Sequence, residues 1–354
     1  MEKIVTAVVG CGKLAGNVHL PNLAENPAVE LRYAVDIVPE RAKAACEKYG
    51  MRAWFTDYRK IFEDKDVRAV MVITSNYAHY EISTDCLNHG LDVFCEKPAT
   101  VNYELSLKMA EAAAKSGRVL EIGVCNRYNR TVELIADMIS RKELGDIYSV
   151  FCSFRAFRSI PGLGGEFTTK AIAGGGVLID WGVHFLDLIL YALGFPQIRT
   201  VSADCSGRLG RDIKNYVYKD MWAGPPDYSG VFDVEDFVSG HVRTDRASVT
   251  FIGAWAQNIG KEEMYIDFMG DKGGVRMNYY GGYTLYRPGR GVLETVTADF
   301  NQPPMHRIET EAFFNGLMTG KRTRNHIDSV LGSMKLLDAI YRSCEARREI
   351  SLED

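Results

Sequence analysis

Three ionisable residues have the types and spacing needed to move a proton beside a cofactor. Asp180 and His184 lie four positions apart in the stretch Gly174–Gly194, whose apolar residues recur at helical spacing. A histidine titrates near neutrality, so His184 can exchange a proton with a hydroxyl group while Asp180 orients it or relays the proton. Lys97 lies two positions after Leu91–Cys95, a segment predicted to be a strand. Its charge can stabilise an alkoxide as it forms.

The same helix also allows two simpler interpretations. In the first, His184 is a structural histidine held by Asp180, because a buried helix must satisfy both polar groups. In the second, Asp180, His184 and Asp187 fall at i, i+4 and i+7 on one face and bind a metal. Asp187 lies nearly two turns from Asp180, and no second His or Cys is predicted nearby. We therefore expect no metal site.

Size and composition exclude several classes of protein. The 354 residues are enough for about two domains, and a net charge of -4 without basic runs argues against nucleic acid as a partner. The Gly174–Gly194 helix is too short and too charged to span a membrane, and no leader segment is expected at the first residues. None of the 8 cysteines forms a Cys-x-x-Cys pair, so neither zinc clusters nor redox dithiols are expected. Unpaired thiols of this kind suit the cytoplasm.

A glycine-rich turn near the start of the chain predicts a dinucleotide site. Gly10, Gly12 and Ala15 form a Gly-x-Gly-x-x-Ala pattern between a strand and a helix, which allows a tight turn and a close approach to a pyrophosphate. The next strand ends in Asp36, where an acidic group can accept both ribose hydroxyls and would repel a 2′-phosphate. This favours NAD over NADP, although Asp36 can also be a turn residue. Arg41, on the following helix, can lie over the adenine or tolerate a phosphate.

Strands and helices alternate through residues 1–125, as expected for a Rossmann domain with a doubly wound parallel sheet. We predict strands at Ile4–Val9, Val29–Val35, Ala69–Thr74, Leu91–Cys95 and Val119–Val124, and helices at His79–His89 and Tyr103–Ser116. Ligands of such sheets bind at the carboxyl ends of the strands. Lys97 and the polar segment Thr74–His79 both lie at such ends.

The second domain, residues 126–354, has a different pattern. We predict strands at Ile147–Arg158, Arg199–Cys205, Asp236–Val242, Ser248–Gln257 and Lys261–Gly270, without a helix between each pair. This indicates an α+β domain with a large, mostly antiparallel open sheet that covers the buried helix. Two long loops, Pro161–Lys170 and Met221–Val231, are expected to bind ligand, and amphipathic helices end the chain.

Together these segments resemble the Gfo/Idh/MocA family of NAD(P)-dependent sugar and cyclitol oxidoreductases. The resemblance covers essentially the whole chain and rests mainly on Glu96-Lys97-Pro98 followed by the Gly-Gly-Gly-Val-Leu-Ile-Asp180-Trp-Gly-Val-His184 segment. It implies that Lys97, Asp180 and His184 are catalytic and that they bind substrate together with Tyr128. It also implies cofactor contacts from Gly10, Gly12, Lys13, Leu14, Asp36, Arg41, Ser75, Asn76, His79, Glu96, Lys97 and Asn126.

We therefore expect a cytoplasmic NAD(H)-dependent dehydrogenase or reductase acting on a sugar, glycoside or cyclitol. One alternative is a glycoside-cleaving enzyme that oxidises the sugar transiently, eliminates the aglycone and returns the hydride. Another is a non-catalytic NAD-binding regulator, which would need the glycine turn and Asp36 but not Lys97 or His184. We also expect a homo-oligomer, a dimer or tetramer, because the open face of the second sheet would otherwise expose apolar side chains.

Overall fold

The computed structural model describes residues 3–279 and 281–352, which divide into two compact units. The first comprises Met1–Tyr128 and Pro304–Leu331, and the second Asn129–Pro303 and Gly332–Asp354. The first boundary lies three residues beyond the one predicted. The segment Pro304–Leu331, expected in the second domain, instead belongs to the first unit.

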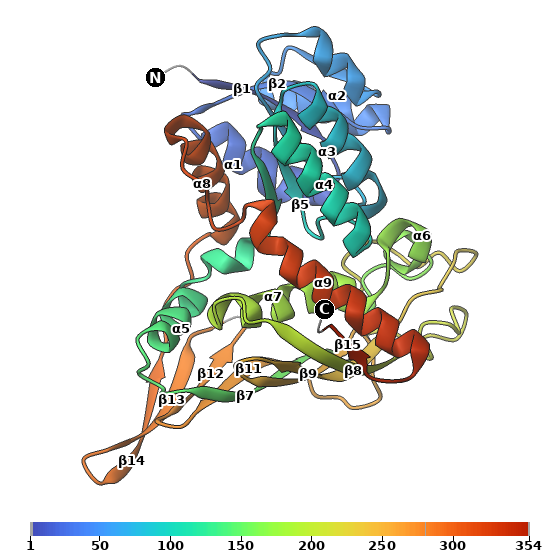
Figure 1. Cartoon of the computed structure of the whole chain (residues 1–354). Helices are drawn as coiled ribbons and strands as arrows, with labels where there is room; N and C mark the ends of the chain where they lie inside the picture. The colour runs from blue at the N-terminus through green and yellow to red at the C-terminus, as the bar shows by residue number, and fades with distance from the viewer. Residues whose placement is uncertain (1–2, 280, 353–354) are drawn as a thin grey trace. The chain divides into compact units, whose positions relative to one another are not determined.

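The first unit contains the predicted parallel sheet (Figure 1). Its strand order is β3-β2-β1-β4-β5-β6, with β1 (Ile4–Val9), β2 (Val29–Val35), β3 (Ala53–Phe55), β4 (Ala69–Val72), β5 (Asp92–Glu96) and β6 (Leu120–Gly123). The helices are η1 (Ala15–His19), α1 (Leu20–Glu25), α2 (Pro39–Tyr49), η2 (Tyr58–Glu63), η3 (Asn76–Ala78), α3 (His79–Asn88), α4 (Tyr103–Ser116), η4 (Cys125–Tyr128) and α8 (Met305–Thr319). The fold class is therefore confirmed for this unit. The three-residue strand β3 was not predicted, because so short a segment has no readable alternation.

Local signals explain where α4 begins and ends. Asn102 accepts a hydrogen bond from the Leu105 amide at 2.9 Å, which satisfies one of the first free N–H groups of the helix. Gly117 follows the last turn with φ +67°, a left-handed conformation that glycine adopts without steric cost. The predicted range Tyr103–Ser116 is the observed one.

Helix α8 belongs to the first unit because it completes that unit's core. Phe313, Phe314 and Leu317 are buried in the same apolar cluster as Phe94 of β5 and Leu20 of α1. An amphipathic pattern shows that a helix has an apolar face, but it does not show which core that face joins. The sequence-based division of the chain could not resolve this point.

The second unit contains a nine-stranded sheet in the order β14-β13-β12-β11-β7-β10-β9-β8-β15. Every adjacent pair is antiparallel except β7 and β10, which run parallel. The strands are β7 (Ile147–Arg155), β8 (Ile198–Ser206), β9 (Phe237–Thr244), β10 (Ser248–Ala254), β11 (Glu263–Gly270), β12 (Gly274–Asn278), β13 (Tyr283–Gly289), β14 (Val292–Ala298) and β15 (Ile350–Ser351). The mostly antiparallel sheet is confirmed. Strand β7 ends at Arg155 rather than at Arg158, whose φ of 59° is incompatible with a strand.

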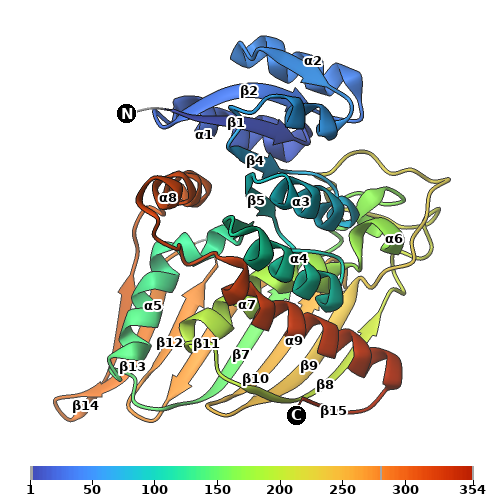
Figure 2. The same ribbon diagram turned by 45° about the horizontal axis from the view of Figure 1, so that its top comes forward.

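Helices cover one face of this sheet, while the other face carries none of the helices that the structure describes (Figure 2). The covering elements include α5 (Arg130–Ser140), η6 (Leu178–Gly182), α7 (Val183–Ala192) and the second-unit part of α9 (Ile327–Ala346), while η5 (Glu166–Thr168) and α6 (Lys170–Ala173) pack against each other. Val150, Cys152 and Phe154 alternate toward the covered face and are fully buried. Tyr265 and Met269 face the opposite side and remain partly exposed.

The helical segment Lys170–Ala192 is long and apolar enough to cross a membrane by length and composition alone, so its shortness is not a valid reason to exclude a span. Within the structure, 72% of its most apolar window is buried. The apolar character of this segment therefore serves packing in the core of the second unit.

Candidate active site

The glycine turn of the first unit has the geometry of a dinucleotide cradle. Gly10 adopts φ +94°, and a Cβ on it would lie 2.1 Å from the Ile73 carbonyl oxygen, so only glycine fits. A Cβ on Gly12 would meet no atom within 4 Å, which leaves open space beside the backbone there. Ala15 is fully buried at the start of η1, where a small residue lets helix and strand pack closely. These features fit a bound pyrophosphate.

Asp36 is held at the end of β2 by two backbone amides. Its Oδ2 accepts a hydrogen bond from the Cys11 amide at 2.8 Å, and its Oδ1 accepts one from the Val38 amide at 2.8 Å. Each carboxylate oxygen has a second lone pair, so both can still accept a ribose hydroxyl. The residues present therefore fit the adenosine end of NAD.

Glu96 is a buried carboxylate next to Lys97. Its Oε1 lies 2.7 Å from His19 Nε2, and its Oε2 accepts a hydrogen bond from the Lys97 amide at 3.0 Å. Burial alone would raise the pKa of Glu96, but the His19 contact and the charges of His306 and Lys97 outweigh it and lower the pKa to about 2. Glu96 is therefore a permanent anion that fixes the backbone at Lys97. His19 itself is completely buried.

His79 is completely buried, and both of its ring nitrogens face backbone carbonyls. Nδ1 lies 2.8 Å from the Pro98 oxygen and Nε2 lies 3.1 Å from the Thr74 oxygen. Burial lowers the pKa of His79, so the ring is neutral and donates to only one of the two carbonyls. The His79 ring therefore links two backbone segments, the one at Thr74 that follows β4 and the one at Pro98 that follows Lys97. These contacts give His79 a positioning role, and its direct contact with the cofactor stays a prediction.

The other predicted cofactor contacts lie on the glycine turn, after strand ends or, for Arg41, on helix α2, and their exposures differ. Asn126 is buried and Ser75 and Asn76 are partly exposed, whereas the most accessible are Lys13, Leu14 and Arg41. Tyr128, a predicted substrate contact, is 4% exposed, and the Arg324 guanidinium lies 4.4 Å from its ring centre. One face of that ring is therefore covered within the first unit.

The helix that carries Asp180 and His184 in the second unit begins at Val177, not at Gly174. Gly174 has φ +87° and ends α6, and a Cβ on Gly176 would lie 1.9 Å from the Glu235 carbonyl oxygen. The consecutive glycines thus allow a close approach of two backbone segments. Residues Leu178–Gly182 form a π-helical turn that includes Asp180, a feature that often occurs at functional sites.

Glu235 caps the start of this helix. Its Oε1 accepts hydrogen bonds from the Gly176 amide at 2.9 Å, the Leu178 amide at 3.0 Å and the Tyr341 hydroxyl at 2.9 Å. Burial raises the pKa of Glu235, and these three donors counteract that rise. The sequence did not reveal Glu235, because its partners come from segments far away in the chain.

Between Val177 and Leu190, only Trp181 and His184 are not fully buried. Asp180 is 9% exposed, and Asp187 is 1% exposed and accepts a hydrogen bond from Ser333 of α9 at 2.6 Å. Asp187 therefore faces α9, whereas His184 has access to the surface of its unit. Within residues 3–279 and 281–352, no group of three His, Cys, Asp or Glu side chains could hold a metal ion.

The two expected binding loops of the second unit pair with each other. The Ala223 amide donates to the Pro161 oxygen at 2.7 Å, and the Asp227 amide donates to the Leu163 oxygen at 2.8 Å. Trp222 and Tyr228 on the second loop remain 52% and 53% exposed. Exposed aromatic rings of this kind can stack on a sugar ring.

Two family models match consecutive parts of the chain. Residues 4–124 match the GFO/IDH/MocA oxidoreductase family, NAD-binding Rossmann fold, and residues 132–276 match the GFO/IDH/MocA C-terminal domain. The chain is 29% identical over 354 residues to D-glucoside 3-dehydrogenase of Escherichia coli (strain K12), covering 98% of this chain and 97% of that protein. It is 37% identical over 141 residues to inositol 2-dehydrogenase of Salmonella typhimurium, covering 39% of this chain and 42% of that protein.

A solved structure of GenD2 from gentamicin A biosynthesis, in complex with NAD, is also similar. It superimposes with a TM-score of 0.81 at 25% identity, covering 100% of this chain and 97% of that one. The similarity thus extends over both units.

Proposed function

The chain belongs to the Gfo/Idh/MocA family of NAD-dependent oxidoreductases, and we propose that its substrate is a secondary alcohol, or the matching ketone, of a sugar, glycoside or cyclitol. The observation that carries this proposal is the accessibility of His184. It is one of two partly exposed side chains along a helix that is otherwise buried from Val177 to Leu190. A purely structural histidine in such a helix would be enclosed like its neighbours.

We assign the chemistry as follows. NAD, when bound, accepts or supplies the hydride at its nicotinamide ring. His184 removes the hydroxyl proton during oxidation and returns it during reduction, with Asp180 orienting the imidazole or relaying that proton. Lys97 places its ammonium group on the oxygen as negative charge develops. Glu96, itself held by His19, fixes the backbone amide of Lys97.

The nature of the relatives supports a carbohydrate substrate. D-glucoside 3-dehydrogenase is similar over nearly the whole chain. The exposed rings of Trp222 and Tyr228 offer stacking surfaces for a pyranose. Among the candidates, an intact glycoside therefore ranks first and a cyclitol second.

A screen of glucosides, free aldoses and inositols with NAD tests this proposal. NADH absorbance and released aglycone should be followed in the same reactions. NADH formation with a glycoside or inositol is the expected result. Aglycone release without net NADH would instead identify the glycoside-cleaving alternative, and NAD binding without any turnover would favour the regulatory one.

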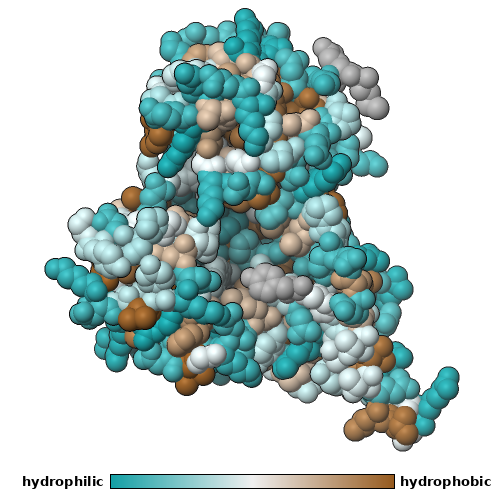
Figure 3. All heavy atoms as spheres, turned by 180° about the vertical axis from the view of Figure 1, so that it is seen from behind, coloured by the Kyte–Doolittle hydropathy of each residue, from teal (hydrophilic) through white to brown (hydrophobic). Residues whose placement is uncertain are grey.

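We also propose a cytoplasmic homo-oligomer that associates through the uncovered face of the nine-stranded sheet. Phe151, Ile252, Tyr265 and Met269 are partly exposed there. The neighbouring hairpin of β13 and β14 carries Leu293 with 91% exposure, and its tip protrudes as a brown knob in Figure 3. A partner copy on this face would remove these apolar side chains from water.

A further inference from the structure

The helix that carries Asp180 and His184 (the catalytic helix, residues 177–192) is not regular. Residues Leu178–Gly182 form a wide π-helical turn, in which the Val183 amide donates to the Leu178 oxygen five positions earlier. Such a turn is one residue longer than an α-helical turn, so it changes the side of the helix on which Asp180 lies relative to His184. The orientation of Asp180 relative to His184 therefore depends on whether the wide turn is kept.

Two contacts with α9 enclose this turn. Before it, the Tyr341 hydroxyl donates to Glu235 Oε1 at 2.9 Å, and the same oxygen accepts from two backbone amides at the start of the catalytic helix. After it, Ser333 Oγ donates to Asp187 Oδ1 at 2.6 Å. Tyr341 and Ser333 lie about two turns apart on α9, so one helix contacts the catalytic helix on both sides of the wide turn (Figure 2).

The start of the catalytic helix has no room to shift. A Cβ on Gly175 would lie 2.0 Å from the Tyr341 hydroxyl oxygen, and a Cβ on Gly176 would lie 1.9 Å from the Glu235 carbonyl oxygen. The Val177 amide donates to that same carbonyl at 3.0 Å. The segments are in direct contact, so the helix start cannot move without displacing Glu235 and Tyr341.

The groups that make these contacts are shielded from water. Glu235 is 7% exposed, and Ser333 and Asp187 are each 1% exposed. Burial raises the pKa of Tyr341 well above its usual value, so its hydroxyl stays protonated and can donate at neutral pH. A buried hydrogen bond is costly to break, because the group left behind cannot bond to water instead. Each contact therefore holds its part of the catalytic helix in one arrangement.

We propose that Tyr341 and Ser333 of α9 are positioning residues for the proton transfer. Held on both sides, the wide turn cannot revert to a regular α-helical turn without breaking one of the two contacts. Asp180 therefore keeps the orientation in which it orients the His184 ring or relays its proton. This inference rests on the function proposed above, in which Asp180 and His184 move the proton.

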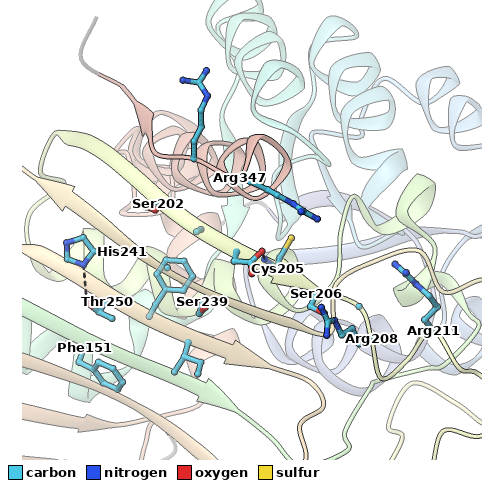
Figure 4. A pocket seen from close by; sticks show the side chains of 17 residues that line it. Phe151, Ser202, Cys205, Ser206, Arg208, Arg211, Ser239, His241, Thr250 and Arg347 are labelled. Carbon is cyan, nitrogen blue, oxygen red and sulfur yellow. Dashed lines mark hydrogen bonds between the residues drawn. The ribbon is translucent and has the colours of Figure 1, made fainter.

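A second serine of α9 provides a matched control. Ser343 is buried like Ser333, but it accepts from the Ala203 amide of β8 at 2.9 Å and donates to the Arg348 oxygen at 2.7 Å. This end of α9 lies beside β8, where Arg347 and residues of that strand line one pocket (Figure 4). Ser343→Ala therefore removes the same group from the same helix and leaves both contacts with the catalytic helix in place.

Steady-state kinetics of the full-length protein test the proposal, with NAD and the glycoside or inositol that yields most NADH. Tyr341→Phe and Ser333→Ala each remove one hydroxyl and should lower kcat by about 10- to 100-fold, since a small misplacement of a catalytic group can cost that much. The loss should not exceed that of Asp180→Asn. KM and the Kd for NADH should stay near those of the wild type, and Ser343→Ala should keep the wild-type kcat.

A double-variant cycle shows whether the two contacts act through Asp180. In an Asp180→Asn background, Tyr341→Phe and Ser333→Ala should lower kcat little further, because the group that they position is already gone. His184→Asn in the same assays tests the proposed function itself, and turnover near wild type in that variant would remove both the catalytic assignment and this inference. With that assignment intact, the inference alone is overturned if Tyr341→Phe and Ser333→Ala turn over like Ser343→Ala per folded molecule, or if their effects add fully to that of Asp180→Asn.

Discussion

The Cys11 amide donates a hydrogen bond to Asp36 Oδ2 at 2.8 Å, which joins the glycine turn to the end of β2. The carboxylate is thereby fixed where a ribose is expected, with one lone pair on each oxygen still available. We predict that NADH binds more tightly than NADPH, since a 2′-phosphate would meet a like charge and lose both ribose hydrogen bonds. Fluorescence titration of the two reduced nucleotides measures this preference.

Asp36→Asn separates the charge from the hydrogen-bonding capacity. It keeps an acceptor but removes the repulsion, so the preference for NADH should fall by about 10- to 100-fold, as expected for a charged hydrogen-bonded pair. Arg41→Ala is a control on the neighbouring helix that leaves the carboxylate in place. Equal affinities for NADH and NADPH in the wild type would contradict the assignment of Asp36.

Glu121 of β6 should make the stability of the first unit depend on pH. Burial raises its pKa, and hydrogen bonds from Thr323 lower it. The effect of burial is the larger one, so the pKa is raised to about 7. A carboxyl whose pKa is raised on folding contributes stability below its unfolded pKa of ~4.5 and loses it as the pH rises toward 7. The cost of ionising it is about 3 kcal/mol once the pH exceeds 7.

Glu121→Gln should therefore flatten the decline in the free energy of unfolding between pH 5 and pH 8. Urea denaturation at the two pH values measures this, with the exposed Glu111→Gln on α4 as a matched control. Buried Glu309, whose pKa is also raised by burial, remains in both variants and sets the residual slope. An unchanged slope in Glu121→Gln would refute the prediction.

Glu235 should matter for stability through its acceptor atom more than through its charge. Glu235→Ala leaves the Gly176 and Leu178 amides and the Tyr341 hydroxyl without this acceptor, so we expect a loss of about 2–5 kcal/mol in the free energy of unfolding. Glu235→Gln retains an oxygen at the same place and should lose much less. Similar losses for both variants in urea denaturation would show that Glu235 contributes to the free energy of unfolding through its charge rather than through its acceptor atom.

The parts of the fold that were predictable are those with strong local patterns. Strands β1 and β2 and helix α4 begin and end at the predicted residues, because apolar patterns, capping residues and a terminal glycine are features of the local sequence. The unit to which α8 belongs was not predictable, since Phe313 and Phe314 meet their partners only in the folded chain.

The candidate site was predictable to a similar extent. Motif positions predict Lys97, Asp180 and His184 as catalytic residues, whereas the groups that hold the segments carrying them were missed. His19 and Glu235 act through contacts that span 77 and 57 to 59 positions, so no spacing rule could reveal them. The π-helical turn at Asp180 also has no sequence signature, and it changes the regular spacing from which a shared helix face was expected.

Assembly through the uncovered sheet face predicts the effect of a charge placed there. Ile252 lies on β10 opposite Ser153 and Ser239, in the middle of the sheet. Ile252→Asp should convert the oligomer to a monomer in light scattering at micromolar concentration, because burying an unpaired carboxylate is costly. Lys335→Asp on α9 is the control for added negative charge. A monomeric wild type would contradict the proposal at once.

The catalytic assignment predicts that turnover and cofactor affinity separate. If His184 and Lys97 act on the transferred proton and on the developing alkoxide, their contacts strengthen mainly in the transition state. His184→Asn should then lower kcat by about 100- to 10,000-fold, and Lys97→Met by about 100-fold or more, while NADH titration gives a Kd near that of the wild type. Asp180→Asn should be milder if Asp180 only orients the ring, and as severe if it relays the proton. A structural role would give the opposite pattern, with lower thermal stability and nearly normal turnover per folded molecule, and would return His184 to the simpler interpretation.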